Sequence, residues 1–140
     1  MSLKVRHISL ITGLVLLVIA SCSQPPLTGP TVGLDQQFDL KANQAASIEG
    51  EPIKVHFVSV PSDTRCPVEE VCVSGQGDAI VSIEVMPDGG STKSFDLHTA
   101  ASQTVTFDAY TIALIQLAPW PQTKDPIPQT NYTATLRVTK

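Results

Sequence analysis

The chain has few of the residues that usually carry enzyme chemistry or nucleic-acid binding. Of its 140 residues, three are histidines and three are cysteines, aromatic residues make up 5%, and charged residues make up 16%. Its nine lysines and arginines are outnumbered by thirteen aspartates and glutamates. Because phosphate binding needs clustered basic side chains, and none cluster here, we expect no nucleic-acid partner.

Motifs for catalysis are also missing. No Gly-x-Ser-x-Gly sequence marks a serine hydrolase, and the glycines of Ser74-Gly75-Gln76-Gly77 lack the lysine and the following helix of a phosphate-binding loop. Beyond the N-terminal segment only His56 and His98 remain, whereas a metal site needs three or four convergent ligands. We therefore expect no catalytic residue, no metal and no cofactor. A small metal-carrying or hydrolytic protein stays an alternative.

The one long apolar run lies near the N-terminus, at residues 10–19. Lys4 and Arg6 precede it, and the small residues Ala20 and Ser21 follow it. A cationic start, an apolar centre and a small-residue exit are typical of a secretory signal. The run is shorter than the roughly 20 residues that span a bilayer. We predict that residues 1–21 are a signal peptide.

The exit of this run, Ile19-Ala20-Ser21-Cys22, resembles the lipobox of bacterial lipoprotein precursors. The resemblance implies cleavage before Cys22 and attachment of lipid to its thiol. Two or three acyl chains, at about 0.8 kcal/mol per buried methylene, give a lasting hold on the membrane. We expect a lipid-anchored protein of the bacterial cell envelope. Since Ser23 rather than Asp follows Cys22, the resemblance implies the outer membrane if the cell has two membranes, and otherwise the outer face of the cytoplasmic membrane.

Residues 22–33 are rich in proline, glycine, serine and threonine. This composition is typical of an extended linker, so we predict a flexible, lipid-attached tether there and a folded domain over residues 34–140. In that domain Cys66 and Cys72 form an even pair in a chain predicted to be exported, which predicts a disulfide. Their spacing fits neither the usual redox pattern nor the usual zinc pattern.

The rest of the chain has the alternation of β-strands. β-branched and apolar residues recur with a period of two, and Pro87-Asp88-Gly89-Gly90 has the composition of a hairpin turn. We predict an all-β domain, a small antiparallel β-sandwich or barrel of seven to eight strands. The strands beginning at Ile53 and Ala79 are expected to pair antiparallel across the cysteine loop. The predicted strands cover residues 38–40, 45–48, 53–60, 79–86, 92–97, 105–107, 110–117 and 132–139.

The sequence Asp63-Thr64-Arg65-Cys66-Pro67, followed by four residues and Cys72, resembles a family of exported bacterial domains of unknown function that are often lipoproteins. The resemblance covers most of residues 38–138. It implies secretion and a compact β domain, and it implies no known reaction. The family commonly has Trp-Ala-Gly after the second cysteine, where this chain has Val73-Ser74-Gly75.

A second resemblance is to chagasin-type inhibitors of cysteine proteases. Leu117-Ala118-Pro119-Trp120-Pro121 is similar to their Arg-Pro-Trp loop, with Ala118 in place of the arginine. Pro87-Asp88-Gly89-Gly90 is a looser counterpart of their middle glycine loop, and their Asn-Pro-Thr-Thr-Gly loop is absent. An inhibitor of cysteine proteases is therefore an alternative function.

Arg65 and Trp120 are the candidate binding residues. Arg65 either presents a charge to a partner or pairs within the loop with Asp63, Glu69 or Glu70, while Asp63 caps the turn. Trp120, between two prolines, is either a core or lid residue or a binding anchor. The function we expect is that of a non-catalytic binding or structural domain. Its partners would be the membrane, through the lipid, and an envelope protein.

Overall fold

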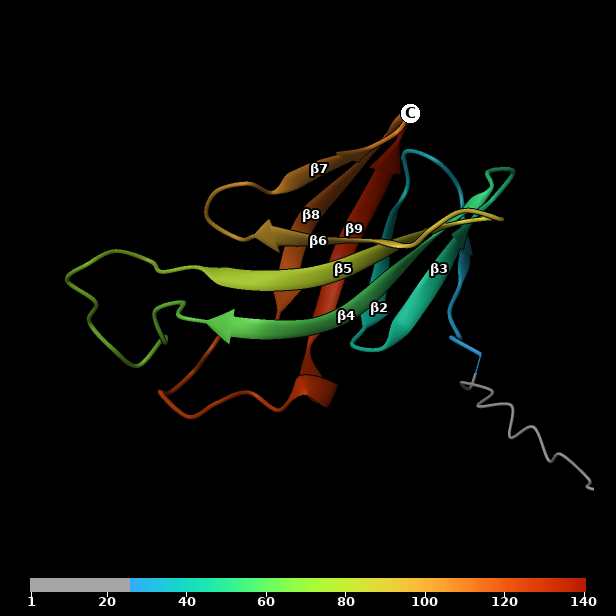
Figure 1. The fold of residues 1–140 in the computed structure, drawn as a ribbon. Helices are drawn as coiled ribbons and strands as arrows, with labels where there is room; N and C mark the ends of the chain where they lie inside the picture. Colours follow the sequence, from blue (N-terminus) through green and yellow to red (C-terminus); the bar gives the residue numbers. More distant parts are fainter. Residues whose placement is uncertain (1–25) are drawn as a thin grey trace, which may run out of the picture.

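Two β-sheets packed face to face form the fold in the computed structural model, which describes residues 26–140 (Figure 1). The predicted signal peptide and the predicted lipid-bearing Cys22 lie outside the described residues. The sheets stay open at their edges, so the sandwich is confirmed and the barrel alternative is wrong.

The first sheet has the order β1-β3-β4-β5-β6 and the second has the order β2-β9-β8-β7. Neighbouring strands run antiparallel except for β1 and β3, which run parallel. The strands are β1 (Thr31–Val32), β2 (Gln37–Lys41), β3 (Gln44–Ile48), β4 (Ile53–Asp63), β5 (Ala79–Pro87), β6 (Lys93–His98), β7 (Thr104–Phe107), β8 (Tyr110–Ala118) and β9 (Thr133–Thr139). A short 3-10 helix, η1 (Gln129–Asn131), precedes β9.

The described residues hold nine strands rather than the predicted seven to eight, because β1 was not expected. The carbonyl groups of Thr28, Pro30 and Val32 accept hydrogen bonds from the β3 side, at 3.3, 3.0 and 2.8 Å. The chain is thus attached to the sheet from Thr28 onwards. Thr28, Pro30 and Val32 lie within the segment that the sequence predicts to be a tether.

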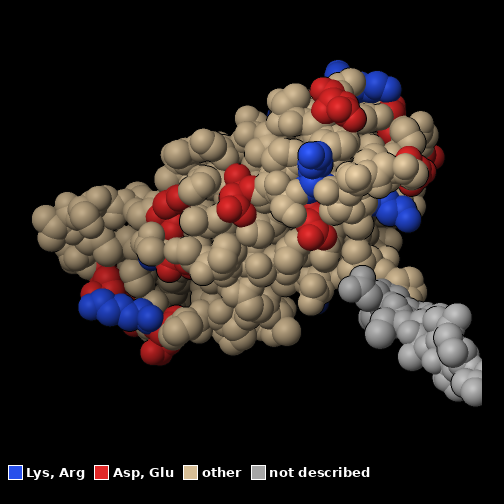
Figure 2. Space-filling model, viewed as in Figure 1, with Lys and Arg blue, Asp and Glu red and all other residues tan. Residues whose placement is uncertain are grey.

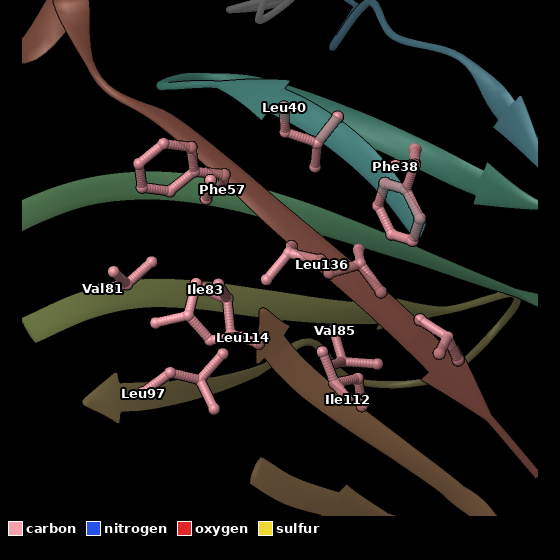
Figure 3. Close-up of a cluster of buried hydrophobic side chains, with 14 of the residues drawn as sticks. Phe38, Leu40, Phe57, Val81, Ile83, Val85, Leu97, Ile112, Leu114 and Leu136 are labelled. Atoms are coloured by element: carbon pink, nitrogen blue, oxygen red, sulfur yellow. The ribbon is translucent and has the colours of Figure 1, made fainter. Parts of the chain in front are cut away.

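The core lies between the two sheets. Every second residue of β5, and of β4 as far as Phe57, belongs to the core, with Val55, Phe57 and Ile83 fully buried. From the opposite sheet, β8 and β9 supply Ile112 and Leu136. Figure 3 shows Phe57, Ile83, Ile112 and Leu136 among the side chains of this buried cluster. Burial of one such side chain is worth about 1.5–3 kcal/mol, so this interdigitation is the main stabilisation of the sandwich.

β4 and β5 form the central hairpin of the first sheet, and their predicted antiparallel pairing is confirmed. Ile53 pairs with Pro87 at one end, and Asp63 pairs with Ala79 at the other. The connection between the two strands therefore leaves the sandwich at one extreme end, on the left of Figure 1. This end carries the predicted disulfide and the candidate binding residues Arg65 and Trp120.

Acidic and basic side chains are scattered over the visible face of the molecule, and Figure 2 shows no continuous basic surface there. Within residues 26–140, no helix has the length and hydrophobicity to cross a bilayer.

Candidate functional site

The candidate site is the long connection between β4 and β5, which we call the disulfide loop (residues 64–78). The predicted bond between Cys66 and Cys72 is present, with the two Cα atoms 6.0 Å apart. Residues 119–128, which follow β8, lie beside this loop. The amide groups of Val68 and Glu69 donate to the carbonyl groups of Pro121 and Gln122, at 3.0 and 3.1 Å.

Arg65 anchors the disulfide loop to the sandwich. Its side chain is almost fully buried, at 3% exposure, and forms an ion pair with Asp63. The guanidinium also donates to the carbonyl groups of Leu117 and Pro119, at 2.8 and 2.9 Å. The pairing with Asp63 is confirmed, and so is the Asp63 cap, because the amide of Arg65 donates to the Asp63 carboxylate at 3.2 Å. At this burial Arg65 presents no charge to a partner.

Asp63 is held in its ionised form. Burial raises the pKa of the Asp63 carboxyl, but the hydrogen bonds from Arg65 and Tyr132 outweigh burial and hold that pKa below its usual value. The Tyr132 hydroxyl donates to Asp63 at 2.9 Å. Burial and this carboxylate together raise the pKa of Tyr132 to about 12. The cluster therefore keeps one fixed protonation state near neutral pH.

Trp120 is the lid of this cluster. The Arg65 guanidinium lies 5.0 Å from the centre of the indole ring, within the range of a cation–π contact. The indole Nε1 donates to the carbonyl of Cys66 at 2.7 Å. The side chain stays 40% exposed, so Trp120 joins residues 119–128 to the disulfide loop at the surface rather than in the core.

The base of the disulfide loop continues the β4–β5 ladder. The amide of Thr64 donates to the carbonyl of Asp78, and the amide of Cys66 donates to the carbonyl of Gln76, both at 2.7 Å. Gly77 has a φ of +73°, and a Cβ atom there would lie 1.9 Å from the carbonyl oxygen of Thr64. Only glycine therefore allows the two arms to approach this closely.

Beyond this base, the loop exposes three valines. Val68, Val71 and Val73 are 64%, 94% and 101% exposed, and we call them the valine tip. In Figure 2 the end of the molecule where the disulfide loop lies in Figure 1 shows an uncharged lobe, with acidic and basic atoms directly below it. The sequence analysis gave these valines no role. Three valines close together, in a loop otherwise rich in turn residues, were the feature of the sequence that could have indicated an exposed apolar surface.

A hollow of about 400 Å³ lies between the disulfide loop and residues 121–129. Asp63, Arg65 and Tyr132 line its inner wall, and Lys124 stands at its rim. The groups of the inner wall already bond to one another, so the hollow holds a satisfied structural cluster.

The two histidines of the domain lie on separate parts of the first sheet. His56 Nδ1 is 3.1 Å from a Glu84 carboxylate oxygen, and His98 Nδ1 is 2.5 Å from Asp78. Burial raises the pKa of Asp78, but the hydrogen bonds from His98, from a backbone amide and from Thr99 outweigh burial and lower that pKa. Among residues 26–140, no three side chains of the His, Cys, Asp or Glu type come together as a metal site.

The two segments that resemble chagasin-type loops lie at opposite ends of the sandwich. The amide of Asp88, in the β5–β6 turn, donates to the carbonyl of Pro52, whereas the indole of Trp120 donates to the carbonyl of Cys66. These places are separated by the eleven residues of β4, roughly 35 Å at about 3.3 Å per residue. One protease cleft cannot receive both segments, so the arrangement gives the inhibitor alternative no support.

Comparison of the chain with protein-family models, with curated proteins and with solved structures gives no match. The function is therefore inferred from the geometry of the disulfide loop.

Proposed function

We propose that the protein is a lipid-anchored, non-catalytic binding protein of the bacterial cell envelope, and that the valine tip is its contact surface. The observation that carries this proposal is the exposure of Val68, Val71 and Val73 on a loop that the rest of the domain holds in place.

The valine tip contributes little to the stability of the isolated domain, because its side chains face water. Each of them gains about 1.5–3 kcal/mol when a partner buries it fully. The Cys66–Cys72 bond and the Arg65 anchor hold the loop before it binds, which reduces the conformational entropy lost on association. Exposed apolar groups of this kind are typical of interaction sites.

The proposed lipid on Cys22 would hold the domain near the membrane. Because the chain is attached to β3 from Thr28 onwards, few residues separate the lipid from the sheet. An extended chain covers about 3.3–3.6 Å per residue, so Cys22 lies at most about 22 Å from Thr28. This short tether favours a partner in the same envelope layer.

The binding proposal is tested by a photo-reactive residue placed at Glu69, beside the valine tip, in cells. We expect one dominant cross-linked envelope protein, and we expect the yield to fall strongly when Val71→Ser and Val73→Ser are added. Ile115→Ser is the matched control, because Ile115 is a 40% exposed apolar side chain on β8. Equal cross-linking by the double variant and the parent would refute the proposal.

The anchoring proposal is tested separately. We expect Cys22→Ser to remain an uncleaved precursor that incorporates no labelled fatty acid. Normal labelling of this variant would refute lipidation at Cys22 and would leave the test of the valine tip unaffected.

A further inference from the structure

The two sulfur atoms of the disulfide have different surroundings. Cys72 is exposed, and its neighbours Val71 and Val73 are 94% and 101% exposed. Cys66 is half-buried, and its Sγ lies 3.6 and 3.8 Å from the carbonyl oxygens of Pro67 and Glu70. Carbonyl oxygens repel an incoming thiolate, so the accessible sulfur is that of Cys72.

The sandwich does not depend on the disulfide for its attachment to the loop. The anchor of Arg65 to Leu117, the bond of Trp120 to Cys66 and the backbone ladder at the base of the loop all lie outside the covalent link. Opening of the disulfide therefore leaves these contacts in place, together with the bonds of the Val68 and Glu69 amides to Pro121 and Gln122, and frees the part of the loop that carries Val71 and Val73.

We propose that the Cys66–Cys72 disulfide exchanges electrons with a protein dithiol that docks on Val71 and Val73. This inference rests on the proposed function and names the chemical class of the partner. An apolar residue on each side of an accessible sulfur gives a partner a surface that aligns its thiolate with the bond to be broken.

The exchange has two steps. A thiolate of the partner attacks Cys72 Sγ, the bond to Cys66 breaks, and Cys66 leaves as a thiolate that takes up a proton. The second thiol of the partner then attacks the mixed disulfide and releases Cys72 as a thiolate, which is also protonated. Two electrons pass from the dithiol to the loop, and the partner becomes a disulfide; the reverse reaction closes the loop.

The charge of the loop favours a protein over a small anionic thiol. Glu69 and Glu70 are both exposed within the closed ring, and Glu70 alone has an ion pair, with Lys124 at 3.3 Å. An anionic thiol approaching Cys72 meets this negative charge, whereas a protein partner offsets the repulsion with apolar contacts to the valines.

Reduction also changes the valine tip. The closed ring fixes Val68 and Val71 relative to each other, and the open chain does not. Redox exchange at Cys72 therefore regulates the same surface that we propose for binding.

The test uses the mature protein in detergent and a thioredoxin-type dithiol whose second cysteine is replaced by serine. This reagent stops the exchange after the first step. We expect a mixed disulfide at Cys72 and a free Cys66 thiol, both identified by peptide mass after alkylation. A mixed disulfide at Cys66 would overturn the inference.

The double variant Val71→Ser with Val73→Ser distinguishes docking of the protein dithiol on the valines from mere accessibility of the Cys72 sulfur. We expect trapping by the protein dithiol to slow about tenfold, corresponding to about 1.4 kcal/mol, while reduction by dithiothreitol changes less than about twofold. Ile115→Ser should change neither rate.

If the double variant loses its envelope cross-link but is trapped as fast as the parent, the dithiol inference fails and the binding function stands. If the parent is trapped at Cys72 at a valine-dependent rate but cross-links no envelope protein, the inference holds and the binding function fails.

Discussion

Arg65 donates two hydrogen bonds to the Asp63 carboxylate, from Nε at 2.8 Å and from the guanidinium NH2 at 2.6 Å. The two residues are almost adjacent in the chain, yet their pairing joins distant segments. The same guanidinium bonds to Leu117 and Pro119, so the end of β4 and the end of β8 meet at one cation. This connection holds the disulfide loop against residues 119–128.

We expect removal of either partner of this ion pair to be strongly destabilising. The side chains of Arg65 and Asp63 are 1% and 9% exposed, so a single substitution leaves a buried charge unpaired. Asp63→Asn and Arg65→Met should each lower the free energy of unfolding by about 3–5 kcal/mol, measured by chemical denaturation. Asp88→Asn, an exposed site, is the control. A loss below about 1 kcal/mol for both variants would contradict this assignment.

The same pair predicts how stability depends on pH. The pKa of Asp63 is lower in the folded protein than in the unfolded chain, where it is about 3.9. The ionised Asp63 carboxyl therefore stabilises the folded protein fully above its unfolded-state pKa. This stabilisation is lost as the pH falls through the lower pKa of the folded state. We expect the unfolding free energy of Asp63→Asn to decrease less between pH 5 and pH 2 than that of the parent. If the unfolding free energies of the two proteins changed with pH in parallel, the pKa of Asp63 would not be lowered in the folded protein.

Trp120→Ala tests the lid. The sequence favoured a core or lid role, and a fully buried aromatic would cost about 3–5 kcal/mol on truncation. Because Trp120 is 40% exposed, we expect a smaller loss, about 2 kcal/mol, from the cation–π contact and the bond to Cys66. Trp120→Phe should keep the contact between the ring and Arg65 but lose the bond to Cys66, so we expect its free energy of unfolding to fall by about 1 kcal/mol. If Trp120→Ala were as stable as the parent, Trp120 would not be a structural lid, and the alternative role of a binding anchor would be favoured.

The main strands were predictable because each has a simple local pattern. The runs that begin at Ile53 and Ala79 alternate cleanly, and the structure has strands from the same residues. Non-local features were not predictable. β1 has only two residues and follows a glycine and a proline, so its pairing depends entirely on β3. From the sequence, Asp63, Glu69 and Glu70 were equally possible partners of Arg65. The carbonyl groups of Leu117 and Pro119, which fix the position of the guanidinium, lie more than 50 residues away in the chain.

The side chain of Gln129 shows another non-local feature. Its amide accepts a hydrogen bond from the amide of Val60 and donates one to the carbonyl of the same residue, both at 2.9 Å. Val60 lies where the β4–β5 register shifts, between Ser59 and Ser62, so Gln129 takes the place of a strand neighbour. Gln129→Ala leaves two backbone groups unpaired, and we expect a loss of about 1–3 kcal/mol in unfolding free energy. Gln37→Ala, on an exposed position of β2, should change stability by less than about 0.5 kcal/mol.

The attachment of the N-terminal strand to β3 depends on Gly29. A Cβ atom at this position would lie 1.9 Å from the carbonyl oxygen of Ala45, which is backbone and cannot move aside alone. Gly29→Ala should therefore lift the segment from β3 and leave the sandwich folded. Hydrogen exchange checks this directly, because the amides of Ser47 and Glu49 donate to Pro30 and Val32. We expect these two amides to exchange about tenfold faster or more, a change of at least about 1.4 kcal/mol.

Gly33→Ala is the matched control for this experiment. A Cβ atom at Gly33 would meet only the flexible end of the Gln36 side chain, at 3.2 Å, which can shift. The control should leave the exchange of both amides unchanged. Amides that bond between β4 and β5 should stay protected in both variants, because β1 pairs with β3 and not with β4 or β5. Full protection of Ser47 and Glu49 in Gly29→Ala would show that the segment tolerates a side chain. The segment would then still be attached to β3, and the proposed lipid would still be joined to the sheet by the short tether inferred from the contact at Thr28.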